Sequence, residues 1–273
     1  MNKKFLVIIA VFLIAVGIFL SIYINRPGRG NSTASGIKPA VSLSSLLSKA
    51  KEMEGKGKLP EARDLYLKLV EDFSGSPEVA HWQKKSEEIN LKLLFSPAIT
   101  KHSLAYEIKP GDTLSKIARN FKTTTELIIK SNNLDSDRII PGRKIKVWNA
   151  PFVIFVDKSQ NILLLKSDEE VVKAYQVSTG KNNCTPVGTF KITSKLPNPT
   201  WFKAGAAVPP QSPDNVLGTR WMGFDLPGYG IHGTTEPKEL GKQVTQGCVR
   251  LSNSDVEELY TIVPMGTEVT IVD

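Results

Sequence analysis

Near the carboxyl end of the chain, the stretch GYGIHGTTEPKELGKQVTQGCVRLSNSD brings a histidine and a cysteine into one short segment. The chain has three histidines and two cysteines, and here His232 and Cys248 are each flanked by a glycine. A thiol attacks a carbonyl carbon as its thiolate, and a nearby imidazole is the usual group that takes the thiol proton and later protonates the leaving amine. We therefore predict that Cys248 is a nucleophile and that His232 is its proton acceptor and donor.

The residues beside this pair have predicted roles of their own. Gly247 lets the backbone come close to a substrate, so that its N–H group and that of Cys248 can donate to the oxyanion of a tetrahedral intermediate. The carbonyl of Gly233 can accept the other imidazole N–H and so fix the tautomer of His232. Arg250 can either bind a substrate carboxylate through paired hydrogen bonds or brace the loop, and the residues leave both roles open.

The elements that position these groups belong to residues 151–273, which predict a mainly β catalytic domain. β-rich runs such as Val153–Val156 and Ile162–Leu165 are separated by turns, and this spacing is typical of an antiparallel sandwich or barrel. The prolines in the segment 196–216 predict an irregular but ordered loop over one face of the domain.

Several motifs of this domain resemble the L,D-transpeptidase family of cell-wall enzymes. The matches are IHGT at 231–234 and TQGCVRL at 245–251, with VSTGK, TPVGTF and NPTW upstream in the family's order. One residue departs from the pattern, because many relatives have histidine or lysine where this chain has Gln246. The resemblance covers nearly the whole domain and implies a β-rich sandwich.

The resemblance also implies an activity. In this family a cysteine attacks the amide after the third residue of a peptidoglycan tetrapeptide stem, releases D-alanine and passes the acyl group to an amine, which cross-links or remodels the cell wall. Two alternatives stay open: a catalytically inactive peptidoglycan-binding scaffold, and an L,D-carboxypeptidase that uses water as the acceptor. Cys184 is expected to be a spare thiol, although a disulfide with Cys248 that would silence the enzyme also stays open.

Residues 104–149 predict a separate strand-helix-helix-strand unit. Its motifs GDTL, IA and I-PG--I-V occur in an order that resembles the lysin motif (LysM) domain, a family that binds N-acetylglucosamine chains of peptidoglycan or chitin. By this resemblance, the glycan-binding residues are Gly111, Asp112, Thr113, Leu114, Asn133, Ile139, Ile140 and Pro141.

The amino-terminal part predicts three further segments. The uncharged run Phe5–Ile24 follows two lysines, and at 1.5 Å per residue it spans about 30 Å, so that residues 1–25 predict a transmembrane signal anchor. Residues 26–42 are rich in glycine, proline, serine and asparagine and predict a flexible linker. Residues 43–95 have apolar residues at helical spacing and resemble a tetratricopeptide unit, with a plain helical hairpin as the alternative.

The predicted fold class is thus multidomain: a β-sandwich catalytic domain, a small βααβ LysM domain and a helical region with a single transmembrane anchor. The predicted location is the cytoplasmic membrane, single-pass, with the catalytic domain in the periplasm or cell-wall space. A net charge of +8 favours anionic neighbours. The expected partners are peptidoglycan glycan chains and stem peptides, the membrane through residues 5–24, and a protein that binds the helical segment. No cofactor, metal or nucleic acid is expected.

Overall fold

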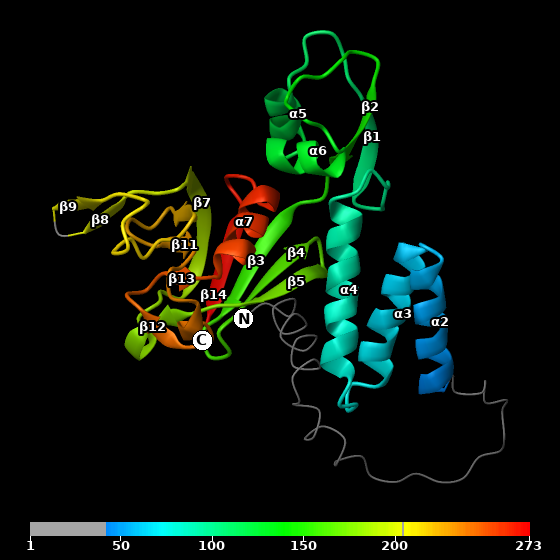
Figure 1. Cartoon of the computed structure of the whole chain (residues 1–273), viewed down its shortest axis with the longest axis horizontal. Coiled ribbons are helices and arrows are strands. Elements are labelled where there is room, and N and C mark those ends of the chain that lie inside the picture. The colour runs from blue at the N-terminus through cyan, green and yellow to red at the C-terminus, as the bar shows by residue number, and fades with distance from the viewer. Residues whose placement is uncertain (1–41, 204) are drawn as a thin grey trace. The chain divides into compact units, whose positions relative to one another are not determined.

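In the computed structural model, which describes residues 42–203 and 205–273, the chain forms two compact units divided between Asn90 and Leu91 (Figure 1). The helices of the first unit are α2 (Leu43–Gly55), α3 (Leu59–Asp72) and α4 (Val79–Leu94), of which α4 continues into the second unit. Ala50 and Ala62 are fully buried, and small side chains of this kind let α2 and α3 approach closely. The likeness of this helical segment to a tetratricopeptide unit stays a prediction.

No helix in the described part of the chain is long and apolar enough to cross a membrane. The longest, α4, has 16 residues, which corresponds to about 24 Å against a hydrocarbon thickness of about 30 Å. The predicted fold class with a transmembrane anchor and the predicted single-pass membrane location were therefore wrong for the described residues. The run 5–24, on which both predictions rested, lies outside these residues, as does nearly all of the predicted linker.

The second unit begins with a small βααβ domain. Its elements are β1 (Ser103–Glu107), α5 (Leu114–Asn120), α6 (Thr125–Ser131) and β2 (Lys144–Trp148). The two strands pair antiparallel, and the hydroxyl groups of Thr113 and Thr124 cap the two helices by accepting a backbone N–H. The domain has its own apolar core, which consists of Ile108, Leu114, Ile117, Ala118, Ile128, Ile145 and Val147.

The rest of the second unit is built on one mixed sheet of eight strands in the order β13-β11-β10-β7-β14-β3-β4-β5. These strands are β3 (Phe152–Asp157), β4 (Ile162–Ser167), β5 (Glu170–Gln176), β7 (Gly188–Pro197), β10 (Arg220–Phe224), β11 (Gly230–His232), β13 (Val249–Arg250) and β14 (Glu268–Val272). The short elements are β6 (Thr179–Gly180), η1 (Lys181–Asn183), β8 (Trp201–Lys203), β9 (Ala206–Val208), η2 (Pro237–Glu239) and β12 (Gln243–Thr245).

The sandwich arrangement of this domain stays a prediction, because the eight strands form two halves that share strand β7. Its first half, Gly188–Lys191, pairs with β14, and its second half, from Ile192 onward, pairs with β10. A ten-residue strand can therefore join both halves of the domain. Helix α7 (Asn253–Ile262) connects β13 to β14, and its buried residues Val256, Leu259 and Ile262 belong to the same core as the sheet.

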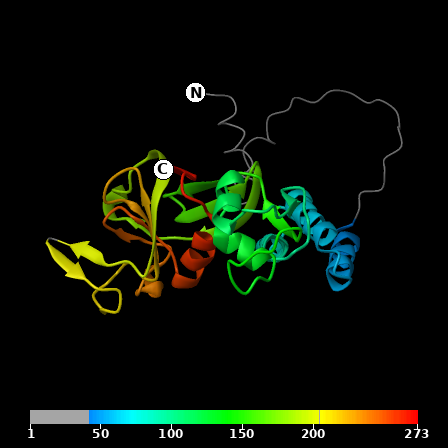
Figure 2. The same cartoon turned by 90° about the horizontal axis from the view of Figure 1, so that it is seen from above.

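The small domain and the large sheet share apolar core. Leu127 of α6 and Trp148 of β2 belong to the cluster that contains α7 and the sheet strands. Helices α6 and α7 lie side by side (Figures 1 and 2), and the hydroxyl group of Thr124 donates to the carbonyl of Thr261. The two domains are therefore fused through packed side chains, not only joined by the chain.

Lys146 strengthens this junction from inside. Its side chain is buried, and its ammonium group donates to the carbonyl oxygens of Leu93 at 2.6 Å and Ser96 at 2.9 Å. Burial lowers the pKa of Lys146 to about 8, and the carbonyl oxygens oppose that shift because they favour the protonated form. The ammonium group thus binds one carbonyl in the last turn of α4 and one just after the helix ends.

Candidate active site

The neighbouring strands β11 and β13 bring the predicted catalytic residues together. They pair in parallel, with Ile231 opposite Val249 and His232 opposite Arg250. Residues that are paired across strands point to the same face of the sheet, and so do residues two apart on one strand. One residue earlier on each strand, the same register places Cys248 beside Gly230. Cys248, His232 and Arg250 therefore share one face.

His232 is held as a neutral imidazole in one orientation. Its side chain is 3% exposed, and its ring stacks against Trp221 with 6.0 Å between ring centres. Nδ1 lies 2.7 Å from the carbonyl oxygen of Gly233. A carbonyl can only accept, so Nδ1 carries the proton and Nε2 is left free to accept one from a thiol. Burial lowers the pKa of His232 to about 4, the Gly233 carbonyl opposes this, and the charge of Arg250 adds to it.

Cys248 is half-buried immediately before β13, and its Sγ lies 3.5 Å from the carbonyl oxygen of Gly228. Burial raises the pKa of the thiol above its ordinary 9.0, whereas the Gly230 N–H and the Arg250 charge lower it and Cys184 raises it. The resting site therefore holds a neutral thiol and a neutral imidazole at neutral pH. If Cys248 acts as a nucleophile, its proton has to move during the attack, and the Gly230 N–H and the Arg250 guanidinium group can stabilise a thiolate there.

The turn before Cys248 requires glycine. Gly247 has a φ of +121°, and a Cβ there would lie 2.6 Å from the ring of Tyr229. The Gly247 N–H donates to Oγ1 of Thr245 at 3.2 Å, and that hydroxyl group donates to the carbonyl of Cys248 at 2.7 Å. Of the two N–H groups predicted to face an oxyanion, the one of Gly247 is thus engaged. The N–H of Cys248 has no partner among the residues that the structure describes.

Arg250 braces a loop in this structure. Its side chain is 7% exposed, and Nη1 donates to carboxylate oxygens of Glu236 at 3.2 Å and Glu239 at 3.0 Å. Its backbone pairs with Ser178 on the other side. Within residues 42–203 and 205–273, its Nε is buried without a hydrogen-bond partner. Of the two predicted roles of Arg250, the contacts of the guanidinium group favour the brace.

The predicted glycan-binding residues lie on two loops of the small domain. Ile108 pairs with the chain at Gly142 and Arg143, so that the loop after β1 and the loop before β2 leave the same end of the strand pair. The eight residues differ in exposure. Leu114 is buried and Ile139 partly buried, whereas Ile140 is 68% exposed.

Polar groups on these loops are partly used inside the domain. The carboxylate of Asp112 accepts from the Lys109 N–H at 2.8 Å and the Tyr106 hydroxyl at 2.9 Å, and both bonds lower its pKa. Thr113 caps α5. Asn133 has a φ of +50° and is exposed, whereas the side chain of the preceding Asn132 forms hydrogen bonds inside the domain. The exposed members of the predicted set are Gly111, Thr113, Asn133, Ile140 and Pro141, of which Thr113 uses its hydroxyl group as the cap of α5.

Several residues of the site were not predicted from the sequence. Gly228 and Gly230 contact the thiol, Glu236 and Glu239 pair with Arg250, and Asn253 holds the chain beside Gly233. A signal existed for the glutamates, because two carboxylates three residues apart, here the N-cap and the last residue of η2, are candidate partners for an arginine. The role of Asn253 needs the fold, because its contacts are with residues 19 and 34 positions away.

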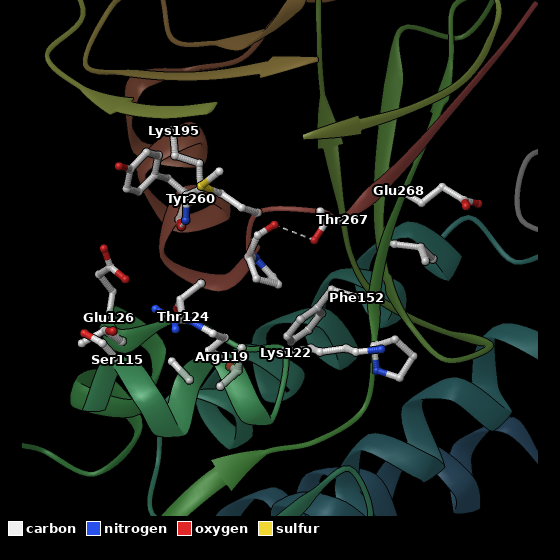
Figure 3. A pocket seen from close by; sticks show the side chains of 18 residues that line it. Ser115, Arg119, Lys122, Thr124, Glu126, Phe152, Lys195, Tyr260, Thr267 and Glu268 are labelled. Atoms are coloured by element: carbon white, nitrogen blue, oxygen red, sulfur yellow. Dashed lines mark hydrogen bonds between the residues drawn. The ribbon is translucent and has the colours of Figure 1, made fainter. Parts of the chain in front are cut away.

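A cleft of 710 Å³ lies elsewhere in the second unit, between α5–α6 and the turn before β14 (Figure 3). None of the predicted catalytic residues lines it. Its lining includes Arg119 and Lys122 on one side and Lys195 and Tyr260 on the other. The Lys195 ammonium group donates to the carbonyls of Tyr260 at 2.7 Å and Val263 at 2.8 Å, so it caps the end of α7.

Comparisons with known proteins agree with this architecture. Residues 151–271 match YkuD, the L,D-transpeptidase catalytic domain, and residues 106–148 match the LysM domain. The chain is 35% identical over 176 residues to a Bacillus licheniformis protein named "Putative L,D-transpeptidase YkuD", which covers 62% of this chain and 98% of that relative. It is 43% identical over 129 residues to "Putative L,D-transpeptidase YqjB" of Bacillus subtilis, or 45% of this chain and 72% of the relative.

Among solved structures, an L,D-transpeptidase from Mycobacterium smegmatis aligns with a TM-score of 0.40 and 21% identity, over 50% of this chain and 65% of the other. The sequence relationships define the class: this chain belongs to the L,D-transpeptidase family and contains a LysM domain. The resemblance to both families is confirmed.

Proposed function

We propose that this protein is a cysteine-dependent L,D-transpeptidase that acts on peptidoglycan stem peptides. The observation that supports this most directly is the common face of β11 and β13. There a buried imidazole with its proton on Nδ1 shares a face with a half-buried thiol, and both lie in the field of Arg250. A structural cysteine and a structural histidine would not require this arrangement.

The proposed reaction has two halves. In the first, Sγ of Cys248 forms a bond to the amide carbon while Nε2 of His232 takes the thiol proton, and the Cys248 N–H donates to the oxyanion. The carbon–nitrogen bond then breaks, the imidazolium returns its proton to the leaving amine, and D-alanine departs from a thioester. In the second half, an acceptor amine loses a proton to His232, attacks the thioester and releases the thiol.

The experiment is to incubate the purified protein with a disaccharide tetrapeptide and to measure free D-alanine and cross-linked product by mass spectrometry. We expect both to form. D-alanine with tripeptide and no dimer would identify water as the acceptor, and neither product would leave the inactive scaffold as the function.

The LysM domain is proposed to hold glycan chains through its two loops. The exposed apolar side chain of Ile140 can pack against a sugar ring, and Asn133 can donate to and accept from an N-acetyl group. Sedimentation with insoluble peptidoglycan tests this, with Ile140→Asp against Leu67→Asp, an exposed leucine of the helical unit, as a control. A protein partner for the helical segment stays a prediction.

Arg250→Lys is expected to slow turnover roughly 10-fold to 150-fold, because charge-assisted bonds worth about 1.5 to 3 kcal/mol join the guanidinium group to its loop. A lysine cannot occupy the geometry that contacts both Glu236 and Glu239. The loss should be equal on a stem peptide with free carboxylates and on the same peptide amidated, since the guanidinium group already binds protein carboxylates. A loss confined to the free-carboxylate substrate would show that Arg250 binds the substrate instead.

A further inference from the structure

We propose that Asn253 is a positioning residue that sets the tautomer of His232, an inference that rests on the proposed role of His232 as the base. Asn253 is the first residue of α7, and its side-chain oxygen accepts two backbone N–H groups. These belong to Thr219 and Thr234, each at 3.1 Å. One carboxamide oxygen therefore joins the start of α7 to the chain before β10 and the chain after β11.

Two glycines leave room for the side-chain oxygen of Asn253. A Cβ on Gly218 or on Gly233 would lie 2.2 Å from Oδ1 of Asn253. Gly218 also has a φ of +65°. The two glycines thus leave a space that the Asn253 oxygen occupies, and the oxygen is the shared acceptor of the N–H groups that follow them.

The link to His232 runs through one peptide group. The carbonyl of Gly233 and the N–H of Thr234 belong to the same planar trans unit and point in opposite directions. When Asn253 holds that N–H on one side, the carbonyl oxygen must face the other side, where Nδ1 of His232 lies at 2.7 Å. The Gly233 N–H is fixed as well, on the carbonyl of Arg220 at 3.2 Å. The peptide cannot rotate without breaking the bond to Asn253.

Removing the Asn253 oxygen should therefore change the orientation of the His232 imidazole and leave substrate binding unchanged. Asn253→Ala is expected to lower kcat about 10-fold to 100-fold with KM unchanged, because a misoriented base slows the chemical step and leaves binding intact. Asn253→Asp keeps an accepting oxygen on the same branch and should stay within about threefold of the parent protein in kcat.

The deciding measurement is the tautomer of His232 by ¹⁵N NMR of protein labelled in its three histidines, with His81→Gln and His102→Gln to assign the signals. The parent protein and Asn253→Asp should show protonated Nδ1 and unprotonated Nε2, and Asn253→Ala should show the two nitrogen shifts moving toward each other. This readout needs no turnover, so it separates failure of this proposal from failure of the proposed function. If Asn253→Ala does not fold, Asn253→Ser replaces it, because a serine hydroxyl is too short to reach both N–H groups.

Asn132→Ala is the matched control. Its carboxamide also joins two elements, accepting from the Lys146 N–H at 2.6 Å and donating to the Ile128 carbonyl at 2.8 Å, but it lies in the LysM domain. It should lower the melting temperature and leave the His232 signals and kcat unchanged. An unchanged His232 tautomer in Asn253→Ala, or an equal fall of kcat in Asn132→Ala, would overturn the proposal.

Discussion

Replacing Cys248 with serine is expected to abolish acyl transfer, with a loss of about 10³-fold or more in kcat. The serine hydroxyl group has a far higher pKa than a thiol, and the base beside it is an imidazole whose pKa burial lowers to about 4. Such a base cannot remove the hydroxyl proton. D-alanine release from a soluble tetrapeptide measures the effect.

Cys184→Ser is the matched control, because Cys184 is the other cysteine of the chain. Its loop lies beside Gly247: a Cβ added to that glycine would be 3.5 Å from the carbonyl oxygen of Cys184. Cys184→Ser should keep activity close to that of the parent protein. Both variants should unfold at nearly the same temperature as the parent, since each replaces one sulfur by oxygen. Activity of Cys248→Ser within tenfold of the parent would remove Cys248 from the role of nucleophile.

Replacing His232 with glutamine is expected to lower kcat about 10²-fold to 10⁴-fold, the usual contribution of a positioned base.

The pH dependence of stability gives an independent test of the buried imidazole. The pKa of His232 is about 4 in the folded protein against 6.5 in the unfolded chain, so between these values the unfolded chain binds more protons. Stability therefore falls as the pH drops from about 6.5 toward 4, by as much as about 3 kcal/mol.

Urea unfolding at pH 7 and pH 5 measures that dependence. The parent protein and the control His81→Gln, whose histidine is exposed, should lose stability between the two pH values, and His232→Gln should lose less. Activity of the parent should persist below pH 6, because the imidazole stays neutral there. A kcat that falls by half near pH 6.5 would contradict a buried neutral base.

Local patterns were sufficient for part of this molecule. The LysM unit and the Gly-flanked His232 and Cys248 were recognisable because each lies in a short motif whose residues are close along the chain. The β-rich character of residues 151–273 followed from the same kind of local alternation. The common face of His232 and Cys248 was not visible, since it depends on the parallel pairing of β11 with β13.

Other features depend on contacts that no local pattern encodes. Asn253 lies two residues after a recognised motif, yet its role comes from N–H groups on two other segments. The continuity of the eight strands depends on β7, whose ten residues pair with two different strands. The transmembrane prediction came from composition in one run of residues, and the helices that the structure describes do not include a spanning segment.

The shared core of the LysM and catalytic domains affects how the protein would work along a polymer. Because Leu127 and Trp148 pack into the same cluster as α7, the span from the loops proposed to bind sugar to Cys248 is set by the fold and not by the reach of a linker. A glycan strand held in those loops would present its stems to the thiol at one distance and one angle. The protein would then select stem peptides by their distance along the glycan strand from the bound sugars as well as by their chemistry.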